Sequence, residues 1–272
     1  MGGGNSQNIF DYNALLFLLK NKMSASLDGG AVIAIPVLYG VSSAVGSYSG
    51  FEQLDTSNQQ GIARAELNWK QYFGSVVISG SEERQNQGEA AIASLLQGKI
   101  QQMEMSLRNT MNTDAFSDGT TNSSKGLDGL AIAVDSTGTY AGIARATYAW
   151  WGAQETAVTG ALTIKRLNKL FNDCSQGGRD YPDLHITDQD EYEAYEALLQ
   201  PDQRFKDNRL ADGGFITLTF KDKPVTWDKA ATAGMWYMIN TSYMGLKYHP
   251  QANFTARPFE KPFNQDAKVS LN

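Results

Sequence analysis

The longest apolar pattern in the sequence is a single stripe that recurs at intervals of three and four residues. Its members are Ile92, Leu95, Leu96, Ile100, Met103, Leu107 and Met111. This spacing predicts one helix over about residues 81–112, roughly 30 residues and about 45 Å long, with one narrow apolar face. Ser79 and Glu82 have the spacing of a capping box at its start. A helix of this length exceeds what the core of an ordinary domain needs.

Gly98 lies in the middle of this helical pattern. Glycine in a helix interior costs about 1 kcal/mol relative to alanine. Flexible methionines follow it at Met103, Met105 and Met111. We interpret Gly98 as a flex point where the helix bends while the methionine side chains fill the changing gaps.

Two strand signals flank a long polar excursion. Residues 31–40 form a β-branched run, and residues 63–70 alternate, with Ala63, Ala65, Leu67 and Trp69 on one face. Between them lie about twenty residues rich in Gly, Ser and polar side chains, whereas hairpin loops usually have two to five. The excursion therefore predicts a functional loop or an arm that reaches a neighbouring molecule.

Further along, helical and strand patterns alternate. They predict a helix at 162–174, a strand at 183–187, a helix at 188–200 stopped by Pro201, a hairpin at 214–228 and a strand at 234–243. The glycine-rich segment before them, 116–129, runs into an apolar run at 130–134 that predicts a short strand. The final residues, 246–272, contain three prolines and are predicted to be extended. These patterns indicate a compact α/β unit between the long helix and the C-terminal segment.

Composition excludes several classes of protein. The formal net charge of −6 argues against a general nucleic-acid binder, which needs clustered Lys and Arg. The single cysteine, Cys174, excludes an intrachain disulfide and a zinc motif, and indicates a reducing compartment. The apolar run at 14–22 is too short to span a bilayer, and its lysines follow rather than precede it. We therefore expect no membrane segment and no export signal.

One cluster resembles a metal or acid–base site: His185 with Asp183, Asp188 and Asp190. Asp188 and Glu191, however, have the spacing of a capping box for the following helix, and His185 alternates within a strand. We favour this structural interpretation.

Other sequence signals for chemistry are missing. The chain has two histidines, and it lacks the GxSxG elbow, the phosphate-binding loop and the dinucleotide fingerprint. Cys174 is interpreted as a helix-end residue, and the Trp150–Trp151 pair as core or interface packing. We predict no catalytic residue, no metal ligand, no cofactor and no enzymatic activity.

The order of these elements resembles that of the major capsid proteins of tailed bacteriophages, which have the Hong Kong 97 fold. The resemblance covers nearly the whole chain and rests on "YSGFEQLDTS", "WKQYFGSVVISGSEER", "FSDGTTNSSKGLDGL", "IARATYAWW" and "FEKPFNQDAKV". It implies an α+β fold. It also implies four parts: an N-terminal arm at 1–30, a peripheral domain at 31–115, an axial domain at 116–240, and a return to the peripheral domain at 241–272. Within the peripheral domain it implies an extended loop at about 39–72 and a spine helix at about 81–112.

The function implied by this resemblance is structural. Copies of the chain would assemble as pentamers and hexamers into an icosahedral shell that encloses double-stranded DNA without sequence-specific binding. Further implied partners are a separate scaffolding protein, a portal and decoration proteins, and the implied location is the virion, after synthesis in the host bacterial cytoplasm. Predicted contacts with neighbouring subunits are Tyr48, Phe51, Leu54 and Trp69.

One feature of related shells is excluded by the sequence. In some related shells, a lysine on the extended loop forms a covalent cross-link to a neighbouring subunit. Residues 39–69 contain no lysine, so we expect non-covalent packing between copies. Two alternatives remain open: an encapsulin-type nanocompartment shell, and a metal-dependent enzyme that uses Asp188, Asp190 and His185.

Overall fold

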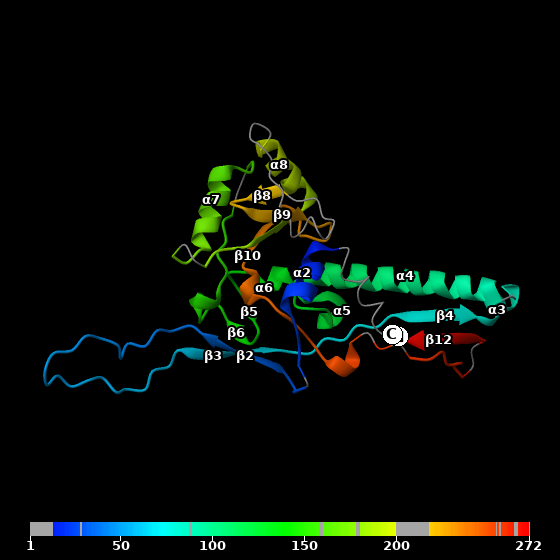
Figure 1. Ribbon diagram of the computed structural model, residues 1–272, viewed down its shortest axis with the longest axis horizontal. Coiled ribbons are helices and arrows are strands. Elements are labelled where there is room, and N and C mark those ends of the chain that lie inside the picture. Colours follow the sequence, from blue (N-terminus) through cyan, green and yellow to red (C-terminus); the bar gives the residue numbers. More distant parts are fainter. Residues whose placement is uncertain are drawn as a thin grey trace. The chain divides into compact units, whose positions relative to one another are not determined.

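The computed structural model describes residues 13–27, 29–86, 89–157, 160–177, 180–199, 218–253, 255, 257–263 and 266–271. They form two compact units (Figure 1). The main unit comprises Met1–Gly29, Lys70–Val134 and Gln154–Asn272, and the hairpin unit comprises Gly30–Trp69 and Asp135–Ala153. Residues 1–12 of the predicted arm and Pro201 lie outside the described residues.

The long helical pattern forms two helices. α3 (Gly80–Gln85) begins with the predicted capping box, in which Ser79 Oγ accepts from the Glu82 N–H at 3.2 Å and Glu82 Oε2 accepts from the Ser79 N–H at 2.9 Å. At the other end, the backbone N–H and side-chain amide of Asn86 both donate to the Glu82 carbonyl. α4 then runs over Glu89–Ala115. The prediction of one unbroken helix over 81–112 was therefore wrong, because Asn86 caps the first helix.

The apolar stripe of α4 is buried from its middle onward. Met103, Leu107 and Met111 are buried. The helix also contacts β4 (Ser75–Ser79), where Lys99 Nζ donates to the Val77 carbonyl at 2.7 Å. β4 pairs antiparallel with β12 (Ala267–Leu271), so the described end of the C-terminal segment is a strand.

A four-stranded sheet forms the centre of the main unit, in the order β10-β7-β9-β8. β7 (Leu184–Thr187) and β9 (Lys223–Trp227) are parallel, whereas β8 (Leu218–Phe220) and β10 (Trp236–Ile239) are antiparallel edge strands. α7 (Ile164–Asp173) and α8 (Gln189–Leu199) share one apolar cluster with this sheet. The elements predicted at 162–174, 183–187 and 188–200 are found here as α7, β7 and α8. Residues 214–217 of the predicted hairpin lie outside the described residues, and the bounds of the axial domain stay a prediction.

The other face of the sheet packs against α2 (Ala14–Met23) and the end of α4. Leu15 and Leu16 of α2 are buried in this cluster with Leu184 and Ile186 of β7. The segment predicted to be an arm thus contributes a helix to the main core. Next along the chain, β1 (Ser24–Ser26) pairs parallel with β11 (Leu246–Tyr248).

Short helices connect these elements. They are α5 (Thr121–Ser124), α6 (Leu130–Ala133), and the 3₁₀ turns η2 (Thr241–Tyr243) and η3 (Pro250–Ala252). The apolar run predicted to be a short strand at 130–134 is the helical turn α6, so that prediction was wrong. Five apolar residues in a row suit either structure, and here Leu130 packs into the core against α4.

The hairpin unit is built on β2 (Ile33–Leu38) and β3 (Ile62–Leu67), which pair antiparallel from Ile33 opposite Leu67 to Leu38 opposite Ile62. The predicted alternation is confirmed, because Ala65 is buried while Arg64 and Glu66 are exposed. A second small hairpin, β5 (Thr139–Tyr140) with β6 (Ile143–Ala144), and the turn η1 (Ala149–Trp151) complete the unit.

Candidate assembly surface

Residues 39–61 are the part of the predicted extended loop that joins β2 to β3, because residues 62–67 form β3; they are called the extended loop below. They carry exposed apolar side chains. Phe51 is fully exposed, and Tyr48 and Leu54 are 66% and 57% exposed. Val41 and Val45 are exposed as well. Scattered exposed apolar residues are normal, but a run of them on one projecting loop is typical of an interaction site.

The two legs of the loop are held close together at its base, where Tyr39 and Gly40 meet Gly61; this base is called the neck below. The backbone N–H groups of Tyr39 and Gly40 both donate to the Gly61 carbonyl, at 2.9 and 3.2 Å. A Cβ atom on Gly61 would lie 2.8 Å from the Gly40 carbonyl oxygen, so the close approach of the two legs requires glycine. Beyond the neck, Ser43 Oγ donates to Gln59 Oε1 at 2.9 Å.

Past the neck the loop has little structure of its own. No backbone-to-backbone hydrogen bond joins residues 41–60, all of which the structure describes, to one another. Its local bonds go to side chains, such as Ser49 N–H to Glu52 and Ser57 N–H to Asp55. The bonds from Ser57 hold the pKa of Asp55 below its usual range. The loop contains two acidic residues, Glu52 and Asp55, and no lysine.

Trp69 differs from the other three predicted contact residues. Tyr48, Phe51 and Leu54 lie on the loop, whereas Trp69 follows β3 and is half-buried, and its Nε1–H donates to the Gly30 carbonyl at 2.8 Å. Trp69 therefore joins the two ends of the segment that carries the hairpin. The contact of all four with a neighbouring subunit stays a prediction.

An aromatic cluster supports the base of the loop. Tyr39 stacks on Trp150 with ring centroids 4.6 Å apart and planes at 9°. Trp150 meets Trp151 edge-on, and Trp151 Nε1–H donates to the Tyr140 carbonyl at 3.1 Å. The sequence indicated packing for the tryptophan pair but gave no signal for Tyr39 as its partner, since 111 residues separate Tyr39 from Trp150.

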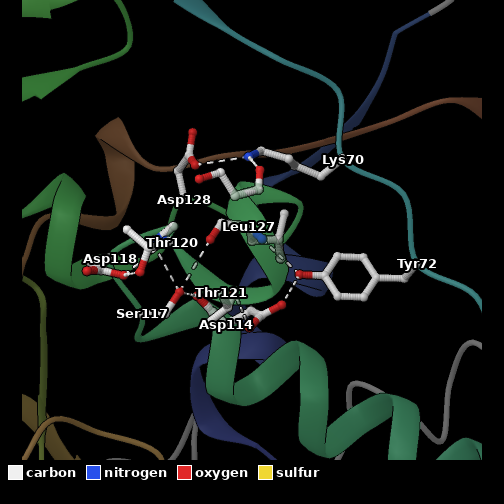
Figure 2. A network of polar contacts seen from close by, with 11 residues as sticks. Lys70, Tyr72, Asp114, Ser117, Asp118, Thr120, Thr121, Leu127 and Asp128 are labelled. Carbon is white, nitrogen blue, oxygen red and sulfur yellow. Dashed lines mark hydrogen bonds and ion pairs between the residues drawn. The ribbon is translucent and has the colours of Figure 1, made fainter.

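The glycine-rich segment is fixed to the end of α4 by a polar network (Figure 2). Tyr72 OH donates to Asp114 Oδ2 at 2.5 Å and accepts from the Leu127 N–H at 2.8 Å, while Thr121 Oγ1 donates to Asp114 Oδ1 at 2.9 Å. Burial and the Asp114 carboxylate raise the pKa of Tyr72 well above its ordinary value, so the phenol stays protonated and keeps donating.

Lys70 strengthens this attachment. Its Nζ donates to the Ser124 carbonyl at 2.8 Å and lies 3.3 Å from Asp128 Oδ1, as Figure 2 shows. The backbone comes so close that a Cβ on Gly129 would lie 2.3 Å from the Asp114 carbonyl oxygen. The network is structural: its carboxylates accept bonds from their own chain.

The candidate metal residues also have structural contacts. Asp188 accepts from the Glu191 N–H at 3.3 Å, as the capping pattern predicted, and from the Gly234 N–H at 2.9 Å. Asp183 accepts from the N–H and hydroxyl of Thr241. Asp190 is exposed at the start of α8. No group of three His, Cys, Asp or Glu residues with metal-binding geometry occurs in the described part of the chain.

His185 is fully buried on β7, with its ring against those of Phe171 and Phe220. Burial lowers the pKa of His185 to about 4, so it is neutral at pH 7. Cys174 lies at the C-terminal end of α7, where burial and the nearby Asp173 raise the pKa of its thiol. Both shifts oppose the roles of a general acid or a nucleophile near neutral pH.

No helix that the structure describes has the length and apolar character needed to cross a membrane.

Comparison with solved structures identifies the fold. The chain is similar to a chain of the capsid asymmetric unit of cyanophage A-1(L), with a TM-score of 0.71 and 20% identity over 96% of this chain and 87% of that one. It is also similar to the holo-SrpI encapsulin of Synechococcus elongatus PCC 7942, with a TM-score of 0.54 and 11% identity over 94% and 79% of the two chains.

A third similar structure is the capsid of a native GTA particle, with a TM-score of 0.53 and 13% identity over 93% of this chain and 82% of that chain. Neither a protein-family model nor a curated protein matches the sequence. The chain has the Hong Kong 97 fold shared by capsid and encapsulin proteins, and the predicted α+β class is confirmed.

Proposed function

We propose that the chain is the major capsid protein of a tailed bacteriophage, assembling as pentamers and hexamers into an icosahedral shell. The observation that carries this proposal is the extended loop, on which the apolar side chains of Tyr48, Phe51 and Leu54 are exposed together with those of Val41 and Val45. In a shell, each copy offers this loop and receives that of a neighbour, which is a heterologous contact that closes around rotation axes.

The shell would enclose double-stranded DNA by confinement. The net charge of −6 supports a container in which DNA is not held by many phosphate contacts. A scaffolding protein, a portal and decoration proteins are the further partners of this proposal, and the virion is the location. The role is mechanical, without catalysis: His185, Asp183 and Asp188 all have contacts that stabilise the fold.

An encapsulin shell is the second candidate, supported by the similarity to the SrpI encapsulin. The phage capsid is favoured because the superposition on the cyanophage capsid chain is closer, with a TM-score of 0.71 against 0.54. The two candidates differ in cargo, so the contents of purified particles distinguish them.

The test is expression of the chain alone and with its genomic neighbours, followed by size-exclusion chromatography and negative-stain electron microscopy. We expect closed shells, or rings of five and six copies. Only monomers or small dimers under all conditions, including with a scaffolding partner, would contradict the proposal.

A further inference from the structure

The two helices that cover one face of the sheet carry opposite charges. α7 contains three basic residues and one acidic residue. α8 contains four acidic residues and no basic residue. Both helices pack on the same apolar cluster of the main unit, through Leu167 and Phe171 of α7 and Tyr192 and Tyr195 of α8. Their remaining faces point away from that cluster.

The charged side chains lie on these outer faces. Lys165 and Lys169 of α7 are exposed, as are Asp190 and Glu193 of α8. Lys169 forms an ion pair with Asp173 one turn further along α7. Exposed pairs of this kind contribute little to stability and exchange readily, so Lys169 can turn to a partner outside the chain.

We propose that, within a ring of copies, the basic face of α7 on one copy lies against the acidic face of α8 on the next. The proposal rests on the shell function proposed above and names the contact that joins neighbouring copies. A second copy is the partner because it complements both faces at once, whereas DNA would be attracted by α7 and repelled by α8. The contact is heterologous, since it joins different patches, and such contacts close into rings.

Charge reversal tests the contact. Variant A carries Lys165→Glu and Lys169→Glu, which makes both helices acidic. Variant B carries Asp190→Lys, Glu193→Lys and Glu196→Lys, which makes both helices basic. Each variant alone sets like charges against each other, so we expect at least a tenfold loss of assembled particles, measured by light scattering and electron microscopy.

Mixing the two variants gives the sharpest result. A and B can alternate around a six-membered ring, but they cannot alternate around a five-membered ring, because five is odd. An equal mixture is therefore expected to recover hexamers in sheets or tubes while five-fold vertices and closed shells stay absent. A nonspecific change in solubility or stability would affect five-membered and six-membered rings alike, so it would not produce this difference.

Folding and total charge need separate controls. Circular dichroism melting shows whether each variant folds, and the milder pair Lys165→Gln with Lys169→Gln is expected to weaken assembly by a smaller factor. The matched control is Lys125→Glu with Lys247→Glu, which changes the total charge as variant A does at exposed lysines outside α7. We expect this control to assemble like the parent.

The outcomes separate this proposal from the shell function. If the parent forms shells while A or B forms them equally well, the contact between α7 and α8 is wrong and the shell function stands. The contact is also wrong if the control loses assembly as variant A does, or if folded A and B fail to assemble together. If the parent forms neither shells nor rings of copies, the shell function itself fails.

Discussion

The extended loop and the four-stranded sheet place apolar side chains in opposite environments. In the sheet, Leu184, Ile186 and Val225 are at most 1% exposed and are covered by helices on both faces. On the loop, Phe51 is fully exposed and its neighbours Tyr48 and Leu54 are more than half exposed. The same kinds of residue thus serve two purposes in one chain.

The difference separates residues that stabilise a single copy from residues that stay available for a neighbour in the proposed shell. Burying a large apolar side chain contributes about 1.5–3 kcal/mol. The sheet obtains this contribution within one copy, whereas the loop obtains it only when another molecule covers it. Substitutions in the sheet should therefore change folding, and substitutions on the loop should change assembly.

Deleting residues 44–58 should have the largest effect. Ser43 and Gln59 already bond across the two legs at 2.9 Å, so the shortened loop can close without disturbing β2 and β3. We expect a folded subunit with an unchanged melting temperature but no shells, measured by calorimetry and electron microscopy. Replacing the same segment by Gly and Ser at equal length is the control for loop length. Unimpaired shells from the deletion would contradict the role of the loop.

The same substitution in the two regions gives a matched pair. Leu184→Ala should lower the free energy of unfolding by about 2–5 kcal/mol, because it leaves a cavity in the core. Leu54→Ala should change it by less than about 0.5 kcal/mol, because Leu54 is exposed in a single copy. Denaturant unfolding of both variants measures the difference. Equal losses in the two would show that the loop has a core of its own.

Acid should weaken the sheet. Burial lowers the pKa of His185 from 6.5 to about 4. Smaller contributions come from Asp183, which raises this pKa, and from Lys221 and Lys223, which lower it. The unfolded chain takes up a proton near pH 6.5, whereas the folded chain resists it until about pH 4. The contribution of His185 is therefore complete above pH 6.5 and falls by about 3 kcal/mol between pH 6.5 and pH 4.

His185→Leu removes this titration. Its free energy of unfolding should fall less steeply than that of the parent over this pH range, whatever its value at pH 7. Denaturant unfolding at a series of pH values measures both slopes, and identical slopes would exclude His185 as the cause.

Gly98→Ala should have the smallest effect. Gly98 is exposed within α4, and an added Cβ meets no atom within 4 Å, so alanine should stabilise the helix by about 1 kcal/mol. We predict that this stiffer helix impairs assembly or later expansion of the shell, as seen by electron microscopy. If the variant assembles and expands like the parent, Gly98 is not a flex point.

The sequence predicted an element well where neighbouring residues in the chain determine it, as in helix caps and strand alternation. The capping box of Ser79 and Glu82, the alternation around Ala65 and the helix start at Asp188 are all found as predicted. Each rests on residues within a few positions of one another, which a sequence displays directly. The interruption at Asn86 was missed, because the apolar stripe begins only at Ile92 and residues 81–88 contain no apolar side chain whose spacing could reveal a break.

Contacts between distant segments could not be predicted in the same way. Tyr72 meets Asp114, and Tyr39 meets Trp150, only because the tertiary fold brings them together. The strand order β10-β7-β9-β8 also depends on packing rather than on any local pattern. For the candidate assembly surface, the length and polarity of the excursion predicted the loop and the resemblance named Phe51 as a contact, but the full exposure of Phe51 in a single copy is seen only in the structure.

Hydrogen exchange of the extended loop in single copies and in assembled particles tests the central claim most directly. Residues 41–60 have no backbone hydrogen bonds to one another, so their amides should exchange rapidly in single copies, while the amides of β7 and β9 are protected. In assembled particles we predict strong slowing within the loop and little change in the sheet. Equally rapid exchange of the loop in both states would contradict the account.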